Sequence, residues 1–312
     1  MKNTLRATIA IGLYPFLLAA TLAQIALTVR FHWDPARSLA HFLPALLLFL
    51  MLLERIVPMV EAWGMTWRSF WRDIRYLVMD GAVIGGTRVA AGWMAIRLAQ
   101  SHPGPLAGAR LLVAVPIALL AWDLAQYALH RYTHEGEGPL ARFLWRTHIA
   151  HHLPDRVYVF MHGVFHPLNA FLNAAILQAV FLGLGLSPLA TFAAMLIIDL
   201  QTILSHFNVE VRAGIFNYLF IGTELHRGHH SADPREAKNY GTVVSIWDLV
   251  FGSFRYAPGK APVALGVCSA PGVPRSEEIL RVLAYPFAHA QVKEEPGGEP
   301  AWHPAGPVRQ TP

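Results

Sequence analysis

The sequence is poor in cysteine and in charge, and each shortage excludes a class of protein. Cys268 is the single cysteine, so an intrachain disulfide and a cysteine-based metal site are both excluded. Charged residues make up 14% of the chain, against roughly 25% in an average soluble domain. The mean hydropathy is positive, at +0.37. These values indicate a membrane protein.

Clustered basic residues and nucleotide-binding motifs are also lacking. The net charge is +5, but the basic residues are scattered, which argues against a nucleic-acid partner. A modest basic excess is usual in the loops of membrane proteins. The sequence has no GxGxxG, haem or flavin signature. We therefore expect no nucleic-acid binding, and we expect any redox electrons to come from a separate donor.

Long uncharged runs predict an all-α integral membrane protein. The first contains 23 residues between Arg6 and Arg30, enough to cross a bilayer core of about 30 Å as a helix. A cleaved signal peptide is the alternative, but the run exceeds the usual apolar region of about 7–15 residues, so a retained anchor is favoured. With this run, the expected set is four spans, over 7–29, 38–53, 76–98 and 111–129.

Two further membrane features complete this expected architecture. Residues 168–198 carry no charge and are broken by glycine, serine and proline near 183–188, which predicts a helical hairpin. Residues 61–77 mix arginine with tryptophan, as an interfacial loop or short surface helix does. With a cytoplasmic N-terminus, the positive-inside rule places the arginines near 68–75 and the histidine-rich segment on the cytoplasmic side.

Histidine is the residue in excess, because 11 of the 16 histidines lie between 130 and 230. His130 and His134, in HRYTH, have the i,i+4 spacing that lets two side chains share one ion on a helix face. Asp123 and Tyr127 precede them on the same face. We expect Asp123 to accept a hydrogen bond from the free ring N–H of a ligating histidine; a hydrated aspartate at a helix end is the alternative.

Two segments share the spacing H-x-x-H-H and follow the first motif. These are His148, His151 and His152 in HIAHH, and His226, His229 and His230 in HRGHH. Each can supply two or three ligands. A solvated histidine-rich loop would explain one such cluster but not three at related spacings.

Three other histidines accompany these clusters. His206 follows Asp199 by seven residues, on one expected helix face. His162 and His166 share H-x-x-x-H spacing, and His166 precedes a proline that suits the first turn of a helix. Nine or ten imidazoles exceed the needs of one ion, so two ions are predicted. Imidazole suits iron, zinc, copper and nickel.

This pattern resembles the fatty acid hydroxylase and sterol desaturase superfamily over about residues 115–255. The resemblance lies in the three histidine motifs, the membrane hairpin between them, HPL at 166–168, SHFN, and Asn239-Tyr240-Gly241 followed by Trp247-Asp248 and Phe251-Gly252. It implies an integral membrane enzyme with two histidine-bound iron ions. Such enzymes use O2 and electrons from a donor of the ferredoxin or cytochrome b5 type to hydroxylate or desaturate a lipid.

The resemblance also implies the roles of individual residues. Asp123, Tyr127 and Asp199 are expected to act beside the metals. The implied ligands are His130, His134, His148, His151, His152, His206, His226, His229 and His230. The chain departs from the family at Asn169, where an acid is frequent, and at Thr202, where some members have histidine. Either the ligand set is slightly smaller, or His166 or water completes it. Zinc could replace iron on purification, because its intrinsic affinity is higher.

These expectations divide the chain into three parts. Residues 1–110 form membrane helices and the interfacial loop, 111–256 the catalytic domain, and 257–312 a tail rich in proline and glycine, disordered at its end. A metal transporter or storage protein and a zinc-dependent membrane hydrolase are the rival functions. The choice among sterol, fatty acyl, sphingoid and carotenoid substrates stays open.

Overall fold

The chain folds into a bundle of long helices that is capped at one end by short helices and loops. The computed structural model describes residues 2–98, 103–267 and 272–288. Cys268, His102, His289 and His303 fall outside these ranges, as does the expected disorder at the end of the tail. The described residues contain no β-strand, only three isolated bridges. The prediction of an all-helical chain is confirmed.

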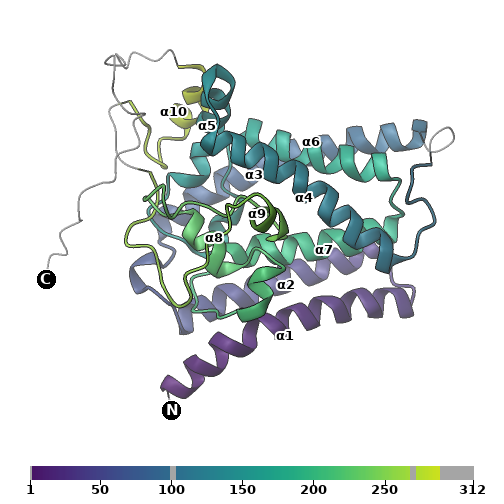
Figure 1. Cartoon of the computed structure of the whole chain (residues 1–312), viewed down its shortest axis with the longest axis horizontal. Helices are drawn as coiled ribbons and strands as arrows, with labels where there is room; N and C mark the ends of the chain where they lie inside the picture. The colour runs from purple at the N-terminus through teal and green to yellow at the C-terminus, as the bar shows by residue number, and fades with distance from the viewer. Residues whose placement is uncertain (1, 99–102, 268–271, 289–312) are drawn as a thin grey trace, which may run out of the picture.

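Six long helices and one of intermediate length make up most of the molecule (Figure 1). They are α1 (Lys2–Arg30), α2 (Pro35–Ile56), α3 (Trp67–Leu98), α4 (Leu111–Glu135), α5 (Gly138–His152), α6 (Pro167–Leu184) and α7 (Pro188–Ser205). The short helices are α8 (Thr223–His229), α9 (Ile246–Val250) and α10 (Ile279–Ala284). The 3-10 turns are η1 (Glu61–Trp63), η2 (Val159–Gly163), η3 (Gly214–Tyr218) and η4 (Tyr285–Phe287).

Five of the helices are long and apolar enough to cross a membrane: α1 from Thr4, α2, α4, α6 and α7. The helix α3 has sufficient length but is not among them. Its first turns carry Arg72 and Asp73, and Asp80 and Arg88 follow further along. The stretch 67–77, expected as an interfacial loop or surface helix, is the beginning of α3. Thr66 Oγ1 accepts a hydrogen bond from Ser69 N (3.2 Å) at this start, as an N-cap does.

The predicted hairpin is present as α6 and α7, and local chemistry fixes its ends. Pro188 stands at the first position of α7, and the Ser187 side chain accepts from Ala190 N (3.1 Å). Gly185 ends α6 with φ +70°, the left-handed conformation that glycine adopts most easily. A Cβ there would lie 1.9 Å from Pro103 O. The segment after residue 102 therefore packs directly on the hairpin turn.

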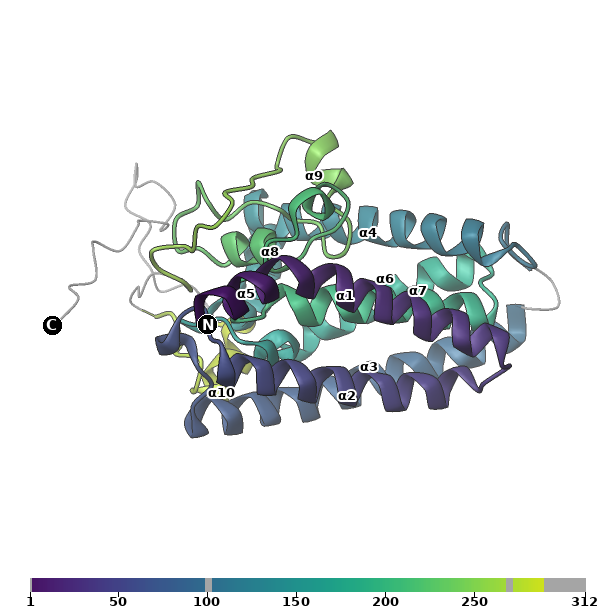
Figure 2. The ribbon, with the colours of Figure 1, turned by 90° about the horizontal axis from the view of Figure 1, so that it is seen from below.

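The helix α7 lies inside the bundle, with α1, α2 and α4 packed against it. Two thirds (67%) of its apolar window is buried, more than in any other candidate span. In the view from below, α1 crosses α7 while α2 and α3 lie along another edge (Figure 2). The helix α6 packs on α3 and α4. Residues of α3, α4, α6 and α7 line a cavity beneath the cap.

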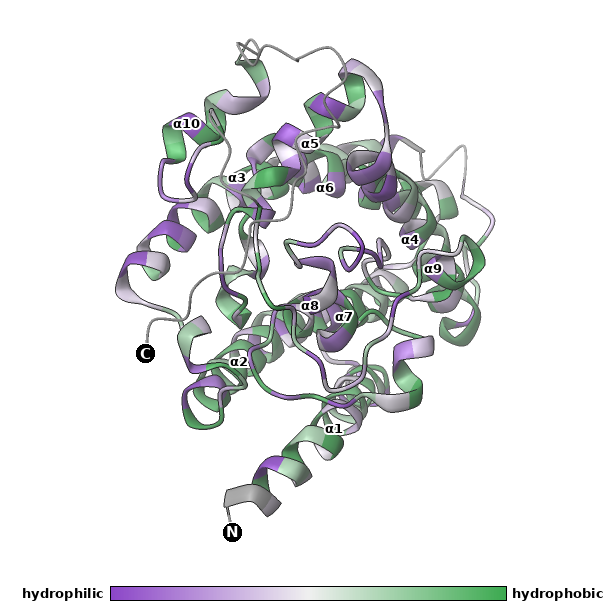
Figure 3. Cartoon of the chain, turned by 60° about the vertical axis from the view of Figure 1, so that its left-hand side comes forward, coloured by the Kyte–Doolittle hydropathy of each residue, from purple (hydrophilic) through white to green (hydrophobic). Residues whose placement is uncertain are grey.

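Polar segments gather at the capped end. Figure 3 shows hydrophilic stretches around α8 and the end of α7, whereas the long helices are mostly hydrophobic. Part of the region expected as a tail joins this cap. Val282 of α10 is fully buried beside Tyr76 and Val164, and Arg146 Nη1 donates to Ala288 O (2.8 Å). The segment 272–288 therefore packs on the outside of α5.

Candidate metal centre

The cap brings nine histidines from distant segments into two adjacent groups. The five-histidine group consists of His130, His134, His148, His152 and His229, and the four-histidine group of His151, His206, His226 and His230. Within each group, one ring nitrogen from each residue lies within 4.8 Å of all the others. The groups adjoin, since the His152 and His230 ring centroids are 4.5 Å apart.

Helix spacing determines which histidines stay together. Each i,i+4 pair remains in one group because its members lie on one face: His130 with His134, His148 with His152, and His226 with His230. The middle histidine of each H-x-x-H-H motif points to the other group. His151 leaves α5 toward the four-histidine group, and His229 leaves α8 toward the five-histidine group. The two motifs are thus shared between two sites.

The distances between nitrogens match those around a metal ion. In the four-histidine group, His206 Nε2 lies 3.1 Å from the Nε2 atoms of His151 and His230, and 3.2 Å from that of His226. In the five-histidine group, His148 Nε2 lies 3.1 Å from Nε2 of His130 and of His152. A metal–nitrogen bond of about 2.0–2.1 Å places neighbouring ligand nitrogens about 3 Å apart.

The outward hydrogen bonds of two rings leave their inner nitrogens free to bind a cation. His130 Nδ1 donates to Tyr240 O (2.9 Å), and His148 Nδ1 donates to Asn169 Oδ1 (3.2 Å). A neutral imidazole has one N–H, so both Nε2 atoms carry lone pairs. These lone pairs face each other at 3.1 Å, an arrangement that is repulsive unless a cation lies between them.

Other rings of the centre are oriented in the same way. His151 Nδ1 donates to Val164 O (3.1 Å) and His229 Nδ1 donates to Lys238 O (3.0 Å). The Nε2 atoms of His134 and His229 are buried and have no protein partner among the described residues. Outward hydrogen bonds that leave the inner nitrogen free are typical of metal-ligating histidine.

Burial keeps the imidazoles in the ligand form. Removal from water, with a further contribution from neighbouring histidines, lowers the pKa of His148, His152 and His230 well below the usual range. The same causes lower the pKa of His226 and His229. Neutral imidazole is the form that binds a metal ion. The donor set therefore fits two borderline ions such as iron or zinc.

Asp123 has a different partner from the expected one. Its Oδ1 accepts from the backbone N–H groups of Thr242 (2.9 Å) and Val243 (2.7 Å) rather than from a histidine ring. These residues belong to the 238–243 loop, which presents Lys238 O and Tyr240 O to the five-histidine group. Asp123 thus acts on the centre through the loop. Tyr127 OH lies 2.8 Å from Ser253 Oγ and accepts from Arg131.

His166 does not join either group. It is the N-cap of α6, where Nδ1 accepts from Leu168 N (3.0 Å) and Nε2 donates to Leu283 O (3.2 Å). Backbone atoms therefore engage both ring nitrogens, and neither is directed at the metal groups. His162 is also outside both groups, with Nδ1 2.8 Å from Val159 O. Thr202 donates to Ile198 O, and the nine histidines assemble without a histidine at that position.

Two supporting residues had no role assigned from the sequence. Asn169, where the resemblance led us to expect an acid, accepts the hydrogen bond from His148 Nδ1. Asp248 accepts from Tyr240 N (2.7 Å) and Gly241 N (2.8 Å), so it shares with Asp123 the task of holding the 238–243 loop. The tripeptide at 239–241 and Asp248 were part of the resemblance, but only the fold shows that they touch.

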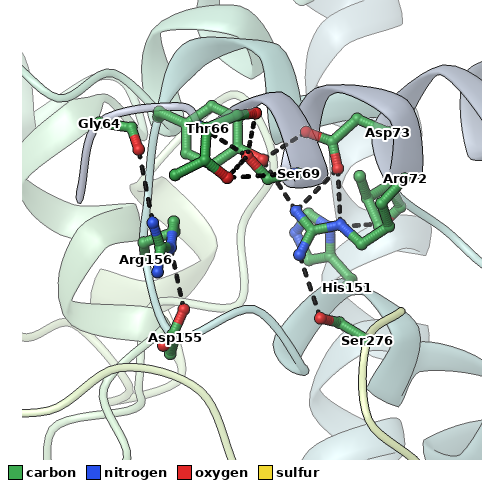
Figure 4. A network of polar contacts seen from close by, with 11 residues as sticks. Gly64, Thr66, Ser69, Arg72, Asp73, His151, Asp155, Arg156 and Ser276 are labelled. Atoms are coloured by element: carbon green, nitrogen blue, oxygen red, sulfur yellow. Dashed lines mark hydrogen bonds and ion pairs between the residues drawn. The ribbon is translucent and has the colours of Figure 1, made fainter. Parts of the chain in front are cut away.

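A buried polar network begins at Arg72 and Asp73 on α3 and joins α3 to the segment that follows α5 (Figure 4). Arg72 pairs with Asp73 (2.7 Å), donates to Tyr158 OH (2.8 Å) and donates to Ser276 Oγ (3.1 Å). The Tyr158 hydroxyl in turn donates to Asp73. Tyr158 follows the histidines of α5 by six residues, so this network fixes the chain leaving HIAHH and the segment 272–288 against one helix.

A cavity of about 370 Å³ opens below the histidines, among α3, α4, α6 and α7. His130 and His148 of one group and His151, His206 and His226 of the other line its upper end. Leu77, Ile84, Leu129, Leu177, Met195 and Ile198 contribute apolar walls. Asp199, expected beside the metals, faces this cavity and is in neither histidine group.

The fold and the site define a helical membrane-type protein with nine histidines arranged to hold two metal ions. Residues 115–253 match the model of the fatty acid hydroxylase family, which confirms the resemblance drawn from the histidine motifs. The match begins in α4 and ends after α9, so it contains every histidine of both groups.

Known proteins similar to this chain act on lipids or related long-chain compounds, as their names state. An ornithine lipid hydroxylase of Rhizobium tropici is 27% identical over 80% of this chain and 75% of its own length. An alkylglycerol monooxygenase of Danio rerio is 26% identical over 61% of this chain and 43% of its own. A very-long-chain aldehyde decarbonylase of Oryza sativa is 29% identical over 44% of this chain and 52% of its own length. No solved structure matches the chain significantly.

Proposed function

We propose that this protein is an O2-dependent di-iron oxidoreductase that hydroxylates or desaturates a membrane lipid. One observation carries the proposal: two adjoining groups of buried or half-buried histidines, with their free nitrogens converging, lie at the end of a largely apolar cavity inside a membrane-type bundle. The family match and the lipid-oxidising relatives support it. Two bound iron ions would supply the reduction of O2 and the oxidation of an unactivated C–H bond.

The chain's own residues hold and orient the centre and exclude water. Backbone carbonyls of Tyr240, Lys238 and Val164 fix three of the rings. The walls of the cavity place a lipid segment below the histidines and keep bulk water away from the reacting carbon. The Arg72 network holds the chain that leaves α5, and the segment 272–288 packs on α5 itself.

The reaction requires two electrons from another protein. Hydroxylation consumes a C–H bond, one O2, two electrons and two protons, and it yields an alcohol and one water. Desaturation with the same inputs removes two hydrogens from adjacent carbons and yields an alkene and two waters. A ferredoxin or a cytochrome b5 type protein is the proposed donor. We propose that the donor meets the cap on the cytoplasmic side.

Two rival functions fit the geometry less well. A transporter needs polar ligands along a pathway through its spans, but the histidine groups lie where helices end and short helices begin. A zinc hydrolase typically needs three protein ligands with an open position, whereas nine histidines converge here. Both differ from an oxygenase in having no need for O2.

Metal content, O2 consumption and lipid mass analysis together test the proposed function. The purified protein should bind about two metal ions per chain, and cells that make it should contain a lipid that has gained one oxygen atom or lost two hydrogens. The matched control is His151→Ala, which should insert in the membrane normally but form no product. Full occupancy near one ion per chain, or product formed without O2, would refute the di-iron oxygenase.

A further inference from the structure

A carboxylate on α2 joins two distant segments beside the four-histidine group. Glu54 lies near the end of α2, and its Oε1 accepts hydrogen bonds from Val159 N (2.8 Å) and Asn208 N (2.6 Å). Val159 is the first residue of η2, and Asn208 follows His206 by two residues. One oxygen atom thus binds backbone N–H groups that lie 105 and 154 residues away from Glu54 in the sequence.

Both segments lead to histidines of the same group. The turn η2 continues directly into Val164, whose carbonyl accepts from His151 Nδ1 (3.1 Å). His151 Nε2 in turn lies 3.1 Å from His206 Nε2. Glu54 therefore anchors the chain that orients one ring of this pair and the chain that carries the other. A shift of either segment would change the distance between two nitrogens that face the same ion.

Arg227 holds the second segment from the side of α8. The residue is 2% exposed, and its Nη2 donates to Phe207 O and Val209 O (3.0 Å each). It directly follows His226, a third member of the four-histidine group. The segment 207–209 is thus held through alternate residues, by a carboxylate that accepts from N–H and by a guanidinium that donates to carbonyls. Both charges suit their partners, and such charge-assisted hydrogen bonds are the stronger kind.

The chain that follows α2 holds the same segment. Met59 N donates to Asn208 O (2.9 Å). The Asn208 side chain accepts from Val60 N (3.1 Å) and donates to Val60 O (2.9 Å). The five-histidine group receives its outer hydrogen bonds from the 238–243 loop and from Asn169 instead. The two groups therefore have separate supports.

We propose that Glu54 is a positioning residue of the four-histidine group and that it acts with Arg227 to fix the spacing of His151 and His206. This rests on the metal centre of the proposed function, but not on its reaction with O2. The helix α2 lies outside the matched region 115–253. A catalytic domain that began at residue 111 would therefore lack part of the support of its own metal site.

Zinc binding in two single-site backgrounds tests this role without any turnover. The His152→Ala background should keep an ion only in the four-histidine group, and the His230→Ala background only in the five-histidine group. The full chain is placed in phosphatidylcholine nanodiscs, and its zinc affinity is measured by competition with a chelator. Glu54→Ala should weaken zinc roughly 10–100-fold in the first background, as loss of an outer partner of a metal ligand does, and should leave the second unchanged.

Three further variants separate positioning from a general loss of stability. Glu54→Gln should restore most of the zinc affinity, because an amide oxygen can still accept from both N–H groups. Arg227→Met removes both donors to the segment 207–209 and should weaken the same ion as Glu54→Ala. The matched control is Asp34→Ala, which removes a carboxylate that accepts from Arg37 N (2.7 Å) at the other end of α2. It should lower the unfolding temperature and leave zinc affinity unchanged in both backgrounds.

Equal weakening of zinc in both backgrounds, or no weakening in either, would overturn the inference, as would a background that holds no ion. If Glu54→Ala did not fold, Arg227→Met would decide by the same comparison. An iron-loaded protein that formed O2-dependent product would retain the proposed function whatever the zinc result. Selective weakening in a protein that formed no such product would support the positioning role and refute the oxygenase.

Discussion

At the scale of single residues, the two nitrogens of a histidine ring have separate tasks in this protein. In His130 and His151 the outer nitrogen donates to a backbone carbonyl and the inner nitrogen is left free. In His166 both nitrogens contact backbone atoms. A prospective ligand therefore has only its outer nitrogen in a hydrogen bond, whereas the helix cap His166 has both nitrogens engaged. All three histidines belong to closely spaced histidine motifs.

Removing one histidine from each group should affect different ions. We expect His152→Ala and His230→Ala each to lower metal content from about two ions per chain to about one, because the two residues belong to different groups. Metal content after equilibration with limiting iron measures this, and His41→Ala, an exposed histidine bound to Arg37 O, is the control. Loss of both ions in either single variant would show that the nine histidines form one inseparable site.

His166→Ala should weaken the fold and spare the metals. Loss of an N-cap costs about 0.5–2 kcal/mol, so the variant should unfold at lower temperature in detergent. His166→Ser should restore most of the stability, since serine caps helices well. Thermal unfolding and metal content, measured on both variants, check this. A drop of one ion per chain in His166→Ala that His166→Ser did not repair would identify His166 as a ligand.

At the scale of elements, the 238–243 loop orients two histidine rings with its backbone carbonyls, a role that side-chain carboxylates have in many metal sites. Asp123 of α4 and Asp248 of α9 accept hydrogen bonds from its backbone. Asn239 adds hydrogen bonds to Leu225 O and Arg255 O and adopts φ +63°. The loop in turn holds His130 and His229. Residues near opposite ends of the matched region 115–253 thus meet at one group.

Asp123→Asn should therefore disturb the five-histidine group selectively. The amide oxygen can still accept a hydrogen bond, but it lacks the charge that strengthens two of them. Outer partners of metal ligands affect affinity by roughly 10–100-fold, so the affinity of one ion should fall within that range and the other should hold. Competition with a chelator measures both. Asp34→Asn, at the N-cap of α2, is the control, and equal weakening of both ions would contradict the assignment.

The sequence predicts the helix-borne part of the site better than the loop-borne part. The i,i+4 pairs His130 with His134 and His148 with His152 stay together because one helix carries each pair. His151 and His152 belong to different groups because of the way α4, α5 and α8 meet. The spacing within one motif gives no information about that meeting. The expected partner of Asp123 was wrong for a similar reason, because its true partners are backbone N–H groups 119 and 120 residues away.

At the scale of the whole molecule, apolar runs predict the helices but not the packing around them. The hairpin at α6 and α7 could be expected because glycine, serine and proline interrupt an uncharged stretch. The beginning of α3 at Trp67 could not be expected, because Arg72 and Asp73 are hidden from water only by their pairing with each other and with Tyr158, which is distant in the sequence. The packing of 272–288 on α5 depends likewise on partners at distant positions, such as Arg146.

The proposed orientation can be tested with matched cysteine variants in a Cys268→Ser background. Arg235 lies on the cap and its side chain is 83% exposed, whereas Arg110 stands at the opposite end of α4 from the histidines. In intact cells, an impermeant maleimide should label Arg110→Cys and should label Arg235→Cys only after lysis. The reverse pattern would place the histidines outside the cytoplasm. Release of both variants from the membrane by carbonate would rule out membrane embedding.

Backbone carbonyl groups orient His130, His151 and His229, and this determines which mutations can reveal their role. Substituting Tyr240, Val164 or Lys238 changes a side chain but leaves the carbonyl in place. An alanine scan would therefore report the packing of these side chains and the Glu135 contacts of Lys238 and Tyr240, but not the role of the carbonyls. Their role in orienting the rings would emerge from changes of chain length instead. Deleting one residue between Lys238 and Tyr240 should be far more damaging than any single replacement there. The orientation of these three rings thus depends on the length of the loops more than on which side chains the loops carry.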